Sequence, residues 1–217
     1  KNHVPITANI DEFVKSCDAI IDFSSPSLSL EIAKKSAEYK KVLVSGTTGF
    51  SDEEKQQFAN YAKNTPIIWS SNMSVGVNLL LNLVEKVSSI LRDDYDIEIL
   101  EMHHNKKVDA PSGTAVRTAE MITNTRKKNN KAAMPDATKT SIPGARGATV
   151  GDVPIHSVRL RGLVAHQEVL LGDQGETLSI RHDSIDRSGF MPGVLLALRE
   201  VGKRPGLTFG LENYMEL

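Results

Sequence analysis

The sequence predicts an α/β chain of two domains: a parallel sheet with helices, then an α+β domain with a mixed or antiparallel sheet. Two observations predict it. In the first third, short apolar runs alternate with segments of helical periodicity, the pattern of parallel strands joined by helices. From residue 95 onward, strand-like runs follow one another with turns at Gly162, Gly172 and Gly175. The 217 residues are enough for one sizeable core or two small ones.

The first domain is expected to open with alternating elements. We expect helices over residues 11–16, 27–40 and 52–63, with Ser27 capping the second and Glu31 in its first turns. The mostly apolar run 17–23 is expected to be a buried strand, and residues 41–45 and 67–70 are expected to be further strands. A long helix with an apolar face follows over residues 75–91. Parallel strands of this kind place ligands at their carboxyl ends.

The second domain is expected to contain strands over residues 95–102, 155–161, 164–171 and 176–181. A helix is expected to start near Val116 and to continue to about Arg126. The basic run Arg126-Lys127-Lys128, with Lys131, lies in an Asn-rich polar stretch and is interpreted as a solvated loop. Residues 190–201 return to helical spacing, and Pro205-Gly206 closes that segment.

Composition and charge exclude several classes of protein. The net charge of −1 gives no overall bias toward nucleic acid or membrane surfaces, so neither is an expected partner. The single cysteine, Cys17, excludes an internal disulfide framework and suits a reducing cytoplasm, where we expect the protein to be. No stretch approaches 18 consecutive apolar residues.

The most informative segment is residues 101–115, where an expected strand ends and an expected helix begins. It combines the pair His103-His104, the pair Lys106-Lys107 and a Pro-Ser-Gly-Thr turn. A histidine exchanges protons near neutral pH, and lysines supply positive charge for carboxylates. The turn adds hydroxyls and free backbone N–H groups at a helix start. The segment therefore suits a small dicarboxylate whose carbon skeleton needs a proton.

Each part of this segment also has an ordinary explanation. A His-His pair is commonly a surface or core feature, and two adjacent lysines are commonly a solvated face. The run from Asp109 to Ser112 is typical of a turn with a helix N-cap. Their coincidence at one strand-to-helix junction favours a functional site over three unrelated features.

The segment resembles the signature of the dihydrodipicolinate reductase family: Glu, one residue, His-His, two residues, Lys, one residue, then Asp-Ala-Pro-Ser-Gly-Thr-Ala. The match is long and gapless, and the resemblance extends over almost all the chain, with residues 123–141 the weakest part. The other segments that resemble the family are Ala19-Ile20-Ile21-Asp22-Phe23-Ser24, residues 44–50, residues 71–78, Gly144-Ala145-Arg146-Gly147, residues 155–159 and Arg181-His182-Asp183-Ser184.

The resemblance implies a Rossmann-like nucleotide-binding domain made of residues 1–74 and 188–217. Residues 75–187 would form the domain for substrate binding and oligomerisation. Such a nucleotide domain normally opens with a Gly-rich turn that holds the pyrophosphate, and no Gly-x-Gly-x-x-Gly occurs in this sequence. We therefore expect the nucleotide domain to be incomplete at its N-terminus, without its first βαβ unit.

The resemblance also implies an activity, the NADH- or NADPH-dependent reduction of 4-hydroxy-tetrahydrodipicolinate to tetrahydrodipicolinate in lysine and diaminopimelate biosynthesis. His103 would be the general acid/base, and Lys107 the proton-donating or carboxylate-pairing cation. The residues implied in substrate binding are His104, Ser112, Gly113 and Thr114. The residues implied in cofactor binding are Gly46, Thr47, Thr48, Ser70, Ser71, Asn72 and Met73.

Other functions stay open at this point. Without a pyrophosphate motif, the chain could bind dicarboxylates without reducing them. A hydrolase using Ser112 with a neighbouring histidine is a weaker alternative, since no Gly-x-Ser-x-Gly elbow occurs. No metal is expected, because adjacent strand residues such as His103 and His104 point to opposite faces.

Because few helices are expected near the second sheet, we expect an apolar face or edge between Ile155 and Ile180 to pair with other copies. The family resemblance implies a homotetramer. The alternative is that the helix from Val116 to Arg126 covers this face within one subunit.

Overall fold

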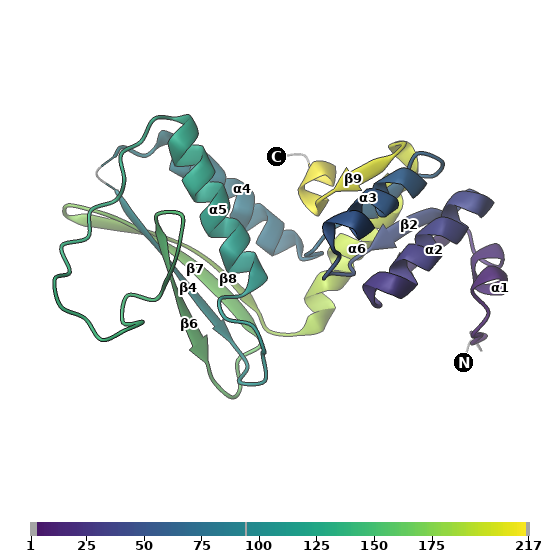
Figure 1. The fold of residues 1–217 in the computed structure, drawn as a ribbon, viewed down its shortest axis with the longest axis horizontal. Coiled ribbons are helices and arrows are strands. Elements are labelled where there is room, and N and C mark those ends of the chain that lie inside the picture. Colours follow the sequence, from purple (N-terminus) through teal and green to yellow (C-terminus); the bar gives the residue numbers. More distant parts are fainter. Residues whose placement is uncertain (1–3, 94, 216–217) are drawn as a thin grey trace. The chain divides into compact units, whose positions relative to one another are not determined.

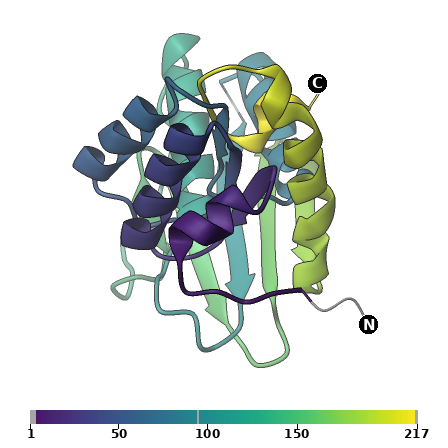
Figure 2. The same ribbon diagram turned by 90° about the vertical axis from the view of Figure 1, so that its right-hand side faces the viewer.

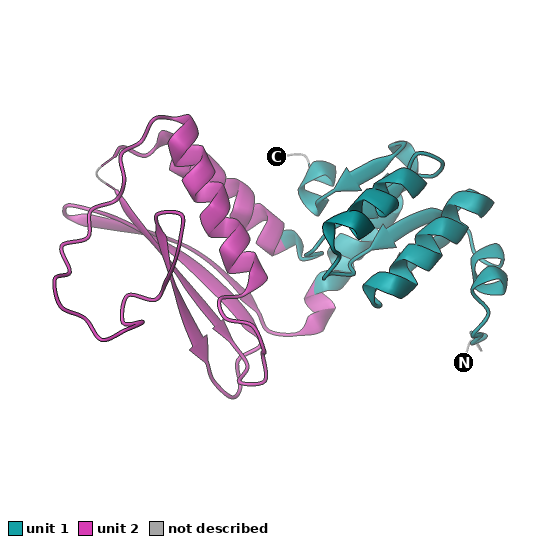
Figure 3. Cartoon of the chain, viewed as in Figure 1, with its two compact units in different colours: residues 1–75, 190–217 teal, residues 76–189 magenta. Residues whose placement is uncertain are grey.

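The computed structural model describes residues 4–93 and 95–215, which fold into two compact units. One unit comprises Lys1–Val75 and Phe190–Leu217, and the other comprises Gly76–Gly189 (Figure 3). The division lies one residue from the expected boundary at 74/75 and two residues from that at 187/188. Residues 1–3, which belong to the start of the expected incomplete nucleotide domain, lie outside the described residues.

The first unit contains a four-stranded parallel sheet in the order β1-β2-β3-β9. Figure 2 shows α2 and α3 on one side of this sheet and α6 on the other. This arrangement confirms the predicted α/β class. The strands are β1 (Ala19–Asp22), β2 (Val42–Ser45), β3 (Ile67–Trp69) and β9 (Leu207–Phe209); the helices are α1 (Ile10–Lys15), α2 (Pro26–Tyr39), α3 (Asp52–Tyr61) and α6 (Met191–Glu200).

The two inner strands of this sheet, β2 and β3, are buried on both faces. Successive strand residues point to opposite sides, so each face has its own apolar cluster. On β2, Leu43 packs in a cluster with residues of α2 and α3 that includes Phe58. The next residue, Val44, packs in a second cluster with α6 that includes Val194. Double burial explains why these short strands are almost wholly apolar.

Two details of the first unit differ from expectation. Helix α2 begins at Pro26 with Ser25 as its N-cap, so the assignment of Ser27 as cap was wrong. The proline is favoured there because its fixed φ suits the first helical position, where its missing N–H costs nothing. Strand β9, three residues long, was not predicted, because such a short segment carries too little periodicity.

The second unit contains a five-stranded mixed sheet in the order β5-β6-β4-β7-β8. The central strand β4 pairs parallel with β6 and antiparallel with β7. The strands are β4 (Asp96–His103), β5 (Ala148–Val150), β6 (Val153–Arg159), β7 (Ala165–Asp173) and β8 (Glu176–Ser184). The mixed sheet confirms the predicted α+β character of this part of the chain, although β5 was not predicted.

Helices α4 (Val75–Ile90) and α5 (Gly113–Lys128) cover one face of this sheet (Figure 1). Leu80 and Val84 of α4 and Ile122 of α5 pack against sheet residues that include Ile99 and Val169. The expectation that few helices lie near the sheet was therefore wrong for this face. In residues 76–93 and 95–189, no other α-helix is present to cover the opposite face.

The basic run after Thr125 was interpreted as a loop, and this was wrong. Helix α5 continues to Lys128, and Arg126 is buried with 2% of its surface exposed. Its guanidinium donates to the carbonyl of Ala132 at 2.8 Å and lies 3.6 Å from the carboxylate of Asp152. The long apolar stem and these partners make burial of the charge tolerable.

Within residues 4–93 and 95–215, no helix combines the length and apolar character needed to cross a membrane.

Candidate active site

The face of the second sheet that packs on the helices changes from apolar to polar toward the end of β4. One row across the strands contains Ile155, Ile99, Val169 and Ile180. The next row on the same face contains Ser157, Glu101, Gln167 and His182. His103 of β4 lies one row further. The apolar core therefore ends where the polar and titratable side chains of this face begin.

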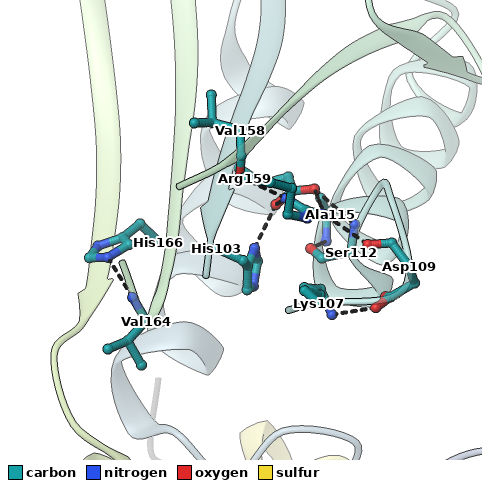
Figure 4. A network of polar contacts seen from close by, with 10 residues as sticks. His103, Lys107, Asp109, Ser112, Ala115, Val158, Arg159, Val164 and His166 are labelled. Atoms are coloured by element: carbon teal, nitrogen blue, oxygen red, sulfur yellow. Dashed lines mark hydrogen bonds and ion pairs between the residues drawn. The ribbon is translucent and has the colours of Figure 1, made fainter. Parts of the chain in front are cut away.

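Glu101 is the centre of this polar layer. Its side chain is fully buried and accepts two hydrogen bonds from Arg159, one to each carboxylate oxygen, both at 2.8 Å. Nδ1 of His103 lies 2.6 Å from Oε2, and the backbone N–H of Ser112 donates to Oε1 at 3.1 Å. Figure 4 shows this network, which joins the end of β4, β6 and the turn before α5.

The electrostatics of the network keep Glu101 ionised. Burial by itself would raise the pKa of the Glu101 carboxyl. Hydrogen bonds from His103, Arg159 and Ser157 outweigh burial and hold this pKa far below its ordinary value. The hydrogen bond to Glu101 in turn raises the pKa of Arg159. A buried charge is stable here because the opposite charge and the donors are already in place.

The turn between β4 and α5 carries the cationic part of the site. Nζ of Lys107 lies 2.7 Å from the carboxylate of Asp109, and this contact lowers the pKa of Asp109. The backbone N–H of Gly113 also favours the ionised form of that carboxylate. Nothing lies within 4 Å of the position that a Cβ on Gly113 would occupy, so a ligand has room to approach the backbone there.

Ser112 and Thr114 shape the start of α5. Ser112 is the N-cap, and its Oγ accepts from the backbone N–H of Ala115 at 3.2 Å. The carbonyl of Thr114 accepts from the hydroxyl of Thr118, which also accepts from Nε2 of Gln167 at 2.8 Å. The side chain of Ser112 is thus used locally, and Gln167 of the polar layer supports the first turn of the helix.

The structure brings most of the predicted residues of this segment into one place. His103 belongs to the Glu101 network, and Lys107, Ser112, Gly113 and Thr114 lie on the adjoining turn and helix start. His104 follows the end of β4, and its Nδ1 accepts from the backbone N–H of Lys106 at 3.2 Å. The described residues contain no group of three or more His, Cys, Asp or Glu arranged to hold a metal ion.

The residues predicted to bind a cofactor lie in the first unit, in two loops that follow β2 and β3. These strands are adjacent and parallel, so both loops leave the same edge of the sheet. Thr48 and Ser71 are exposed, Gly46 and Asn72 are half-buried, and Thr47, Ser70 and Met73 are buried. The Ser70 hydroxyl donates to the carbonyl of Asn72 at 2.8 Å and accepts from the N–H of Leu211.

Asp22, at the end of β1, organises the first of these loops. The buried carboxylate accepts from the hydroxyls of Ser45 at 2.8 Å and Thr47 at 3.0 Å, and also from Ser29. Thr47 in turn accepts from the N–H of Ser24 at 2.9 Å. The Thr47 side chain is therefore engaged in holding the loop, and the loop presents mainly backbone and Thr48.

Sequence reasoning did not assign a site role to Glu101, Arg159 or Asp22. One signal could have indicated the role of Glu101: this residue follows Ile97 and Ile99 at a spacing of two, and His103 follows it at the same spacing. A carboxylate that shares a strand face with core residues must be buried and needs a buried partner. Arg159, 58 residues away, could not be identified as that partner from spacing.

Comparison with known proteins identifies the family. Family models described as "Dihydrodipicolinate reductase, C-terminus" and "Dihydrodipicolinate reductase, N-terminus" match residues 76–215 and 1–73. The 4-hydroxy-tetrahydrodipicolinate reductase of Mycobacterium sp. (strain KMS) is 44% identical over 98% of this chain and 85% of its own length. That of Streptomyces avermitilis is 49% identical over 80% of this chain and 70% of its own length.

A solved structure agrees with this result. The dipicolinate-bound dihydrodipicolinate reductase from Paenisporosarcina sp. TG-14 is 36% identical, with a TM-score of 0.85. The match covers 99% of this chain and 81% of that protein. Sequence models, sequence relatives and structure thus agree over both units, and the chain belongs to the dihydrodipicolinate reductase family.

Proposed function

We propose that this chain reduces 4-hydroxy-tetrahydrodipicolinate to tetrahydrodipicolinate with a reduced pyridine nucleotide, as a step of lysine and diaminopimelate biosynthesis. Enzymes of this family use such a nucleotide. One observation supports the assignment most strongly: His103 is held by a buried ionised carboxylate beside a cationic turn and a helix N-terminus. That arrangement suits a dianionic substrate whose reduction consumes a proton.

The reaction adds a hydride to a ring carbon and releases the hydroxyl as water, which consumes one proton. A bound nicotinamide supplies the hydride. Nδ1 of His103 is engaged by Glu101, so Nε2 is the ring nitrogen left to exchange a proton with the substrate. Lys107 adds a positive charge close to the substrate, where it pairs with a carboxylate or supplies the proton. General acid–base help of this kind is worth roughly 10² to 10⁴ in rate.

The substrate carboxylates are assigned to the groups around the start of α5. The backbone N–H groups of the first helical turn and the positive end of the helix dipole favour an anion beside Gly113 and Thr114. His104 contributes a ring nitrogen, and Ser112 assists mainly by capping the helix. A dicarboxylate would then bridge the helix start and the histidine pair.

The loops after β2 and β3 are assigned to the nicotinamide and its ribose. Their position at the carboxyl ends of parallel strands and the exposure of Thr48 and Ser71 support this assignment. Gly46, Thr47, Ser70, Asn72 and Met73 would contribute backbone groups or hold the loops in shape. The sequence contains no Gly-rich turn for the pyrophosphate. The residues assigned here therefore account for the nicotinamide half of the cofactor alone. We leave both NADH and NADPH as candidates.

The two other functions considered above have less support. A dicarboxylate-binding protein without reductase activity is not favoured, because relatives matching 98% of the chain are named as reductases. A hydrolase would need Ser112 as nucleophile, yet this serine is 3% exposed and its Oγ caps α5.

We also propose that the chain acts as a homotetramer in the cytoplasm. The tetramer is supported by the face of the second sheet opposite α4 and α5, where Val158, Leu160 and Leu170 are exposed. The cytoplasmic location rests on the single cysteine, as argued above.

Titration of the purified chain with NADH, NADPH and pyridine-2,6-dicarboxylate tests the reductase assignment, together with turnover of 4-hydroxy-tetrahydrodipicolinate followed by loss of reduced nucleotide. We expect dicarboxylate and nucleotide to bind and the substrate to be reduced. Dicarboxylate binding without nucleotide affinity or turnover would contradict the assignment and favour the binding protein.

A further inference from the structure

We propose that Glu101 and Arg159 are positioning residues that fix the tautomer and orientation of His103, and that the same carboxylate couples His103 to the anion-binding start of α5. This inference rests on the proposed function and adds two residues to it. Neither residue touches the substrate in this account; both act through His103 and the turn.

The geometry assigns a defined part to each contact. The ionised Glu101 carboxylate can only accept hydrogen bonds, so Nδ1 of His103 at 2.6 Å must carry the proton. The other ring nitrogen, Nε2, is then available for the substrate. Arg159 holds both carboxylate oxygens at 2.8 Å and therefore prevents the carboxylate from rotating away from the histidine.

The second part of the proposal concerns the turn. Oε1 of Glu101 accepts from the N–H of Ser112, the N-cap of α5, at 3.1 Å. Arg159 also donates to the carbonyl of Asp109 at 2.8 Å. One ion pair, between the buried Glu101 carboxylate and the partly exposed Arg159 guanidinium, thus holds the histidine at the end of β4 and the turn that carries Lys107. A proton donor and its anion site need fixed mutual geometry for efficient transfer.

The chain provides a matched control on the opposite face of the same strand. Glu98 lies 2.7 Å from Nε2 of His156 and also accepts from the guanidinium of Arg146. This is again one glutamate with one histidine and one arginine, but Glu98 and Glu101 lie on opposite faces of β4. Glu98→Gln therefore changes the same chemistry without changing the candidate site.

The experiment compares wild type, Glu101→Gln, Arg159→Lys and Glu98→Gln by steady-state kinetics and by ¹⁵N NMR of the histidine rings at alkaline pH. His103→Gln identifies the His103 signals. In wild type we expect His103 to be protonated at Nδ1. The amide introduced by Glu101→Gln keeps one oxygen for the Ser112 N–H but replaces the other oxygen with a donor group. His103 is therefore expected to move toward the Nε2–H tautomer in this variant.

We expect Glu101→Gln to lower kcat roughly 10²-fold with a much smaller change in KM, because ordering of a general acid is lost. Arg159→Lys keeps the charge but loses the two-pronged contact, so it is expected to lower kcat by roughly 10-fold and serves if Glu101→Gln folds poorly. Glu98→Gln should retain wild-type turnover and the His103 tautomer. Because Glu98 lies on the sheet face proposed for assembly, light scattering is used to check that this variant keeps the wild-type mass.

An unchanged His103 tautomer in Glu101→Gln, or a kcat no lower than that of Glu98→Gln, would overturn the proposal. Equal losses of kcat in Glu101→Gln and Glu98→Gln would likewise mark Glu101 as a purely structural residue. If wild type itself fails to reduce the substrate, the proposed function fails, while the NMR comparison still decides whether Glu101 fixes His103.

Discussion

At the scale of single residues, the buried carboxylate of Glu101 is also a source of pH-dependent stability. Its pKa in the folded protein is held far below the ordinary value of 4.5 by His103, Arg159 and Ser157. The stabilisation is therefore fully present above about pH 4.5 and is lost as the pH falls from there toward the depressed pKa. The group makes the native state more sensitive to acid than to base.

Glu101→Gln tests this dependence, because the amide resembles a carboxyl that is always neutral. At neutral pH we expect the variant to lose about 2 to 3 kcal/mol of the free energy of unfolding, since Arg159 loses its ionised partner. Below the ordinary pKa the difference from wild type should shrink. Urea unfolding at several pH values measures both quantities. A difference that stays constant into strong acid would show that Glu101 is not ionised in the native protein.

Asp109 is a second informative residue, because its carboxylate contacts the groups that we assign to the substrate. The Asp109 carboxylate lies 2.7 Å from Nζ of Lys107 and accepts a hydrogen bond from the backbone N–H of Gly113. The Asp109 side chain is 49% exposed. A pair of this kind is worth only about 0.2 to 1 kcal/mol, so a substrate carboxylate can displace it.

We predict that Asp109→Asn tightens binding of pyridine-2,6-dicarboxylate by at most about 5-fold. This fold-change corresponds to about 1 kcal/mol, the upper value for an exposed ion pair that the ligand must displace. Isothermal titration calorimetry measures this affinity. Asp52→Asn is a suitable control, because Asp52 forms a similar surface pair with Lys55 at 2.7 Å in the other unit. Weaker binding in Asp109→Asn would show instead that Asp109 holds Lys107 in place for the substrate.

At the scale of helices and strands, Gly193 of α6 determines how closely that helix approaches the loop after β3. A Cβ at this position would lie 1.9 Å from the carbonyl oxygen of Met73, which is backbone and cannot turn aside. Met73 itself is 1% exposed and packs in the core beneath the loop. The shape of the second predicted cofactor loop therefore depends on a glycine 120 residues further along the chain.

We predict that Gly193→Ala lowers the free energy of unfolding by about 1 to 3 kcal/mol and weakens nucleotide binding, because the loop must shift. Gly202→Ala is the matched control, since no atom lies within 4 Å of the Cβ position there. Thermal unfolding and nucleotide titration of both variants provide the comparison. Similar behaviour of the two variants would contradict the role assigned to Gly193.

The success of sequence reasoning at this scale depended on segment length and on local contrast. Long segments such as α4 and the strands around residues 96 and 165 were predicted within one or two residues at most ends, because their periodicity is strong. The strands β5 and β9 have three residues each and were missed. The end of α5 lies in a basic, Asn-rich stretch that is typical of a solvated loop, although tertiary contacts bury Arg126.

The residues of the candidate site also differ in whether the sequence alone could identify them. The segment from His103 to Thr114 is contiguous, so its chemistry is visible in the sequence and its elements meet at one turn. The residues that hold it together are distant: Arg159 comes from β6, and Gln167 comes from β7. Such partners follow from the strand order of the mixed sheet, which spacing along the chain does not determine.

At the scale of the whole molecule, assembly is the first property to test. The sheet face opposite α4 and α5 combines exposed apolar residues with the ion pairs of Glu98 and Asp183. An exposed face of this mixed character is typical of a protein–protein interface. Closed symmetric association through it would remove the exposed apolar area from water.

We predict a fourfold mass for the wild-type chain in light scattering and a smaller assembly for Leu170→Arg. Leu79→Arg is the matched control, because Leu79 of α4 is 38% exposed and Leu170 is 39% exposed. The control should keep the fourfold mass. A wild-type monomer, or loss of assembly only in Leu79→Arg, would contradict an interface on this sheet face.

The central claim is that His103, held by the buried Glu101 carboxylate, supplies the proton for reduction of a cyclic dicarboxylate. Steady-state kinetics of His103→Gln with 4-hydroxy-tetrahydrodipicolinate test it most directly. We predict that kcat falls by roughly 10² to 10⁴ while KM changes by only a few fold, because the histidine acts in the transition state more than in binding. An increase in KM with kcat unchanged would show that His103 only binds the substrate, and would contradict the account.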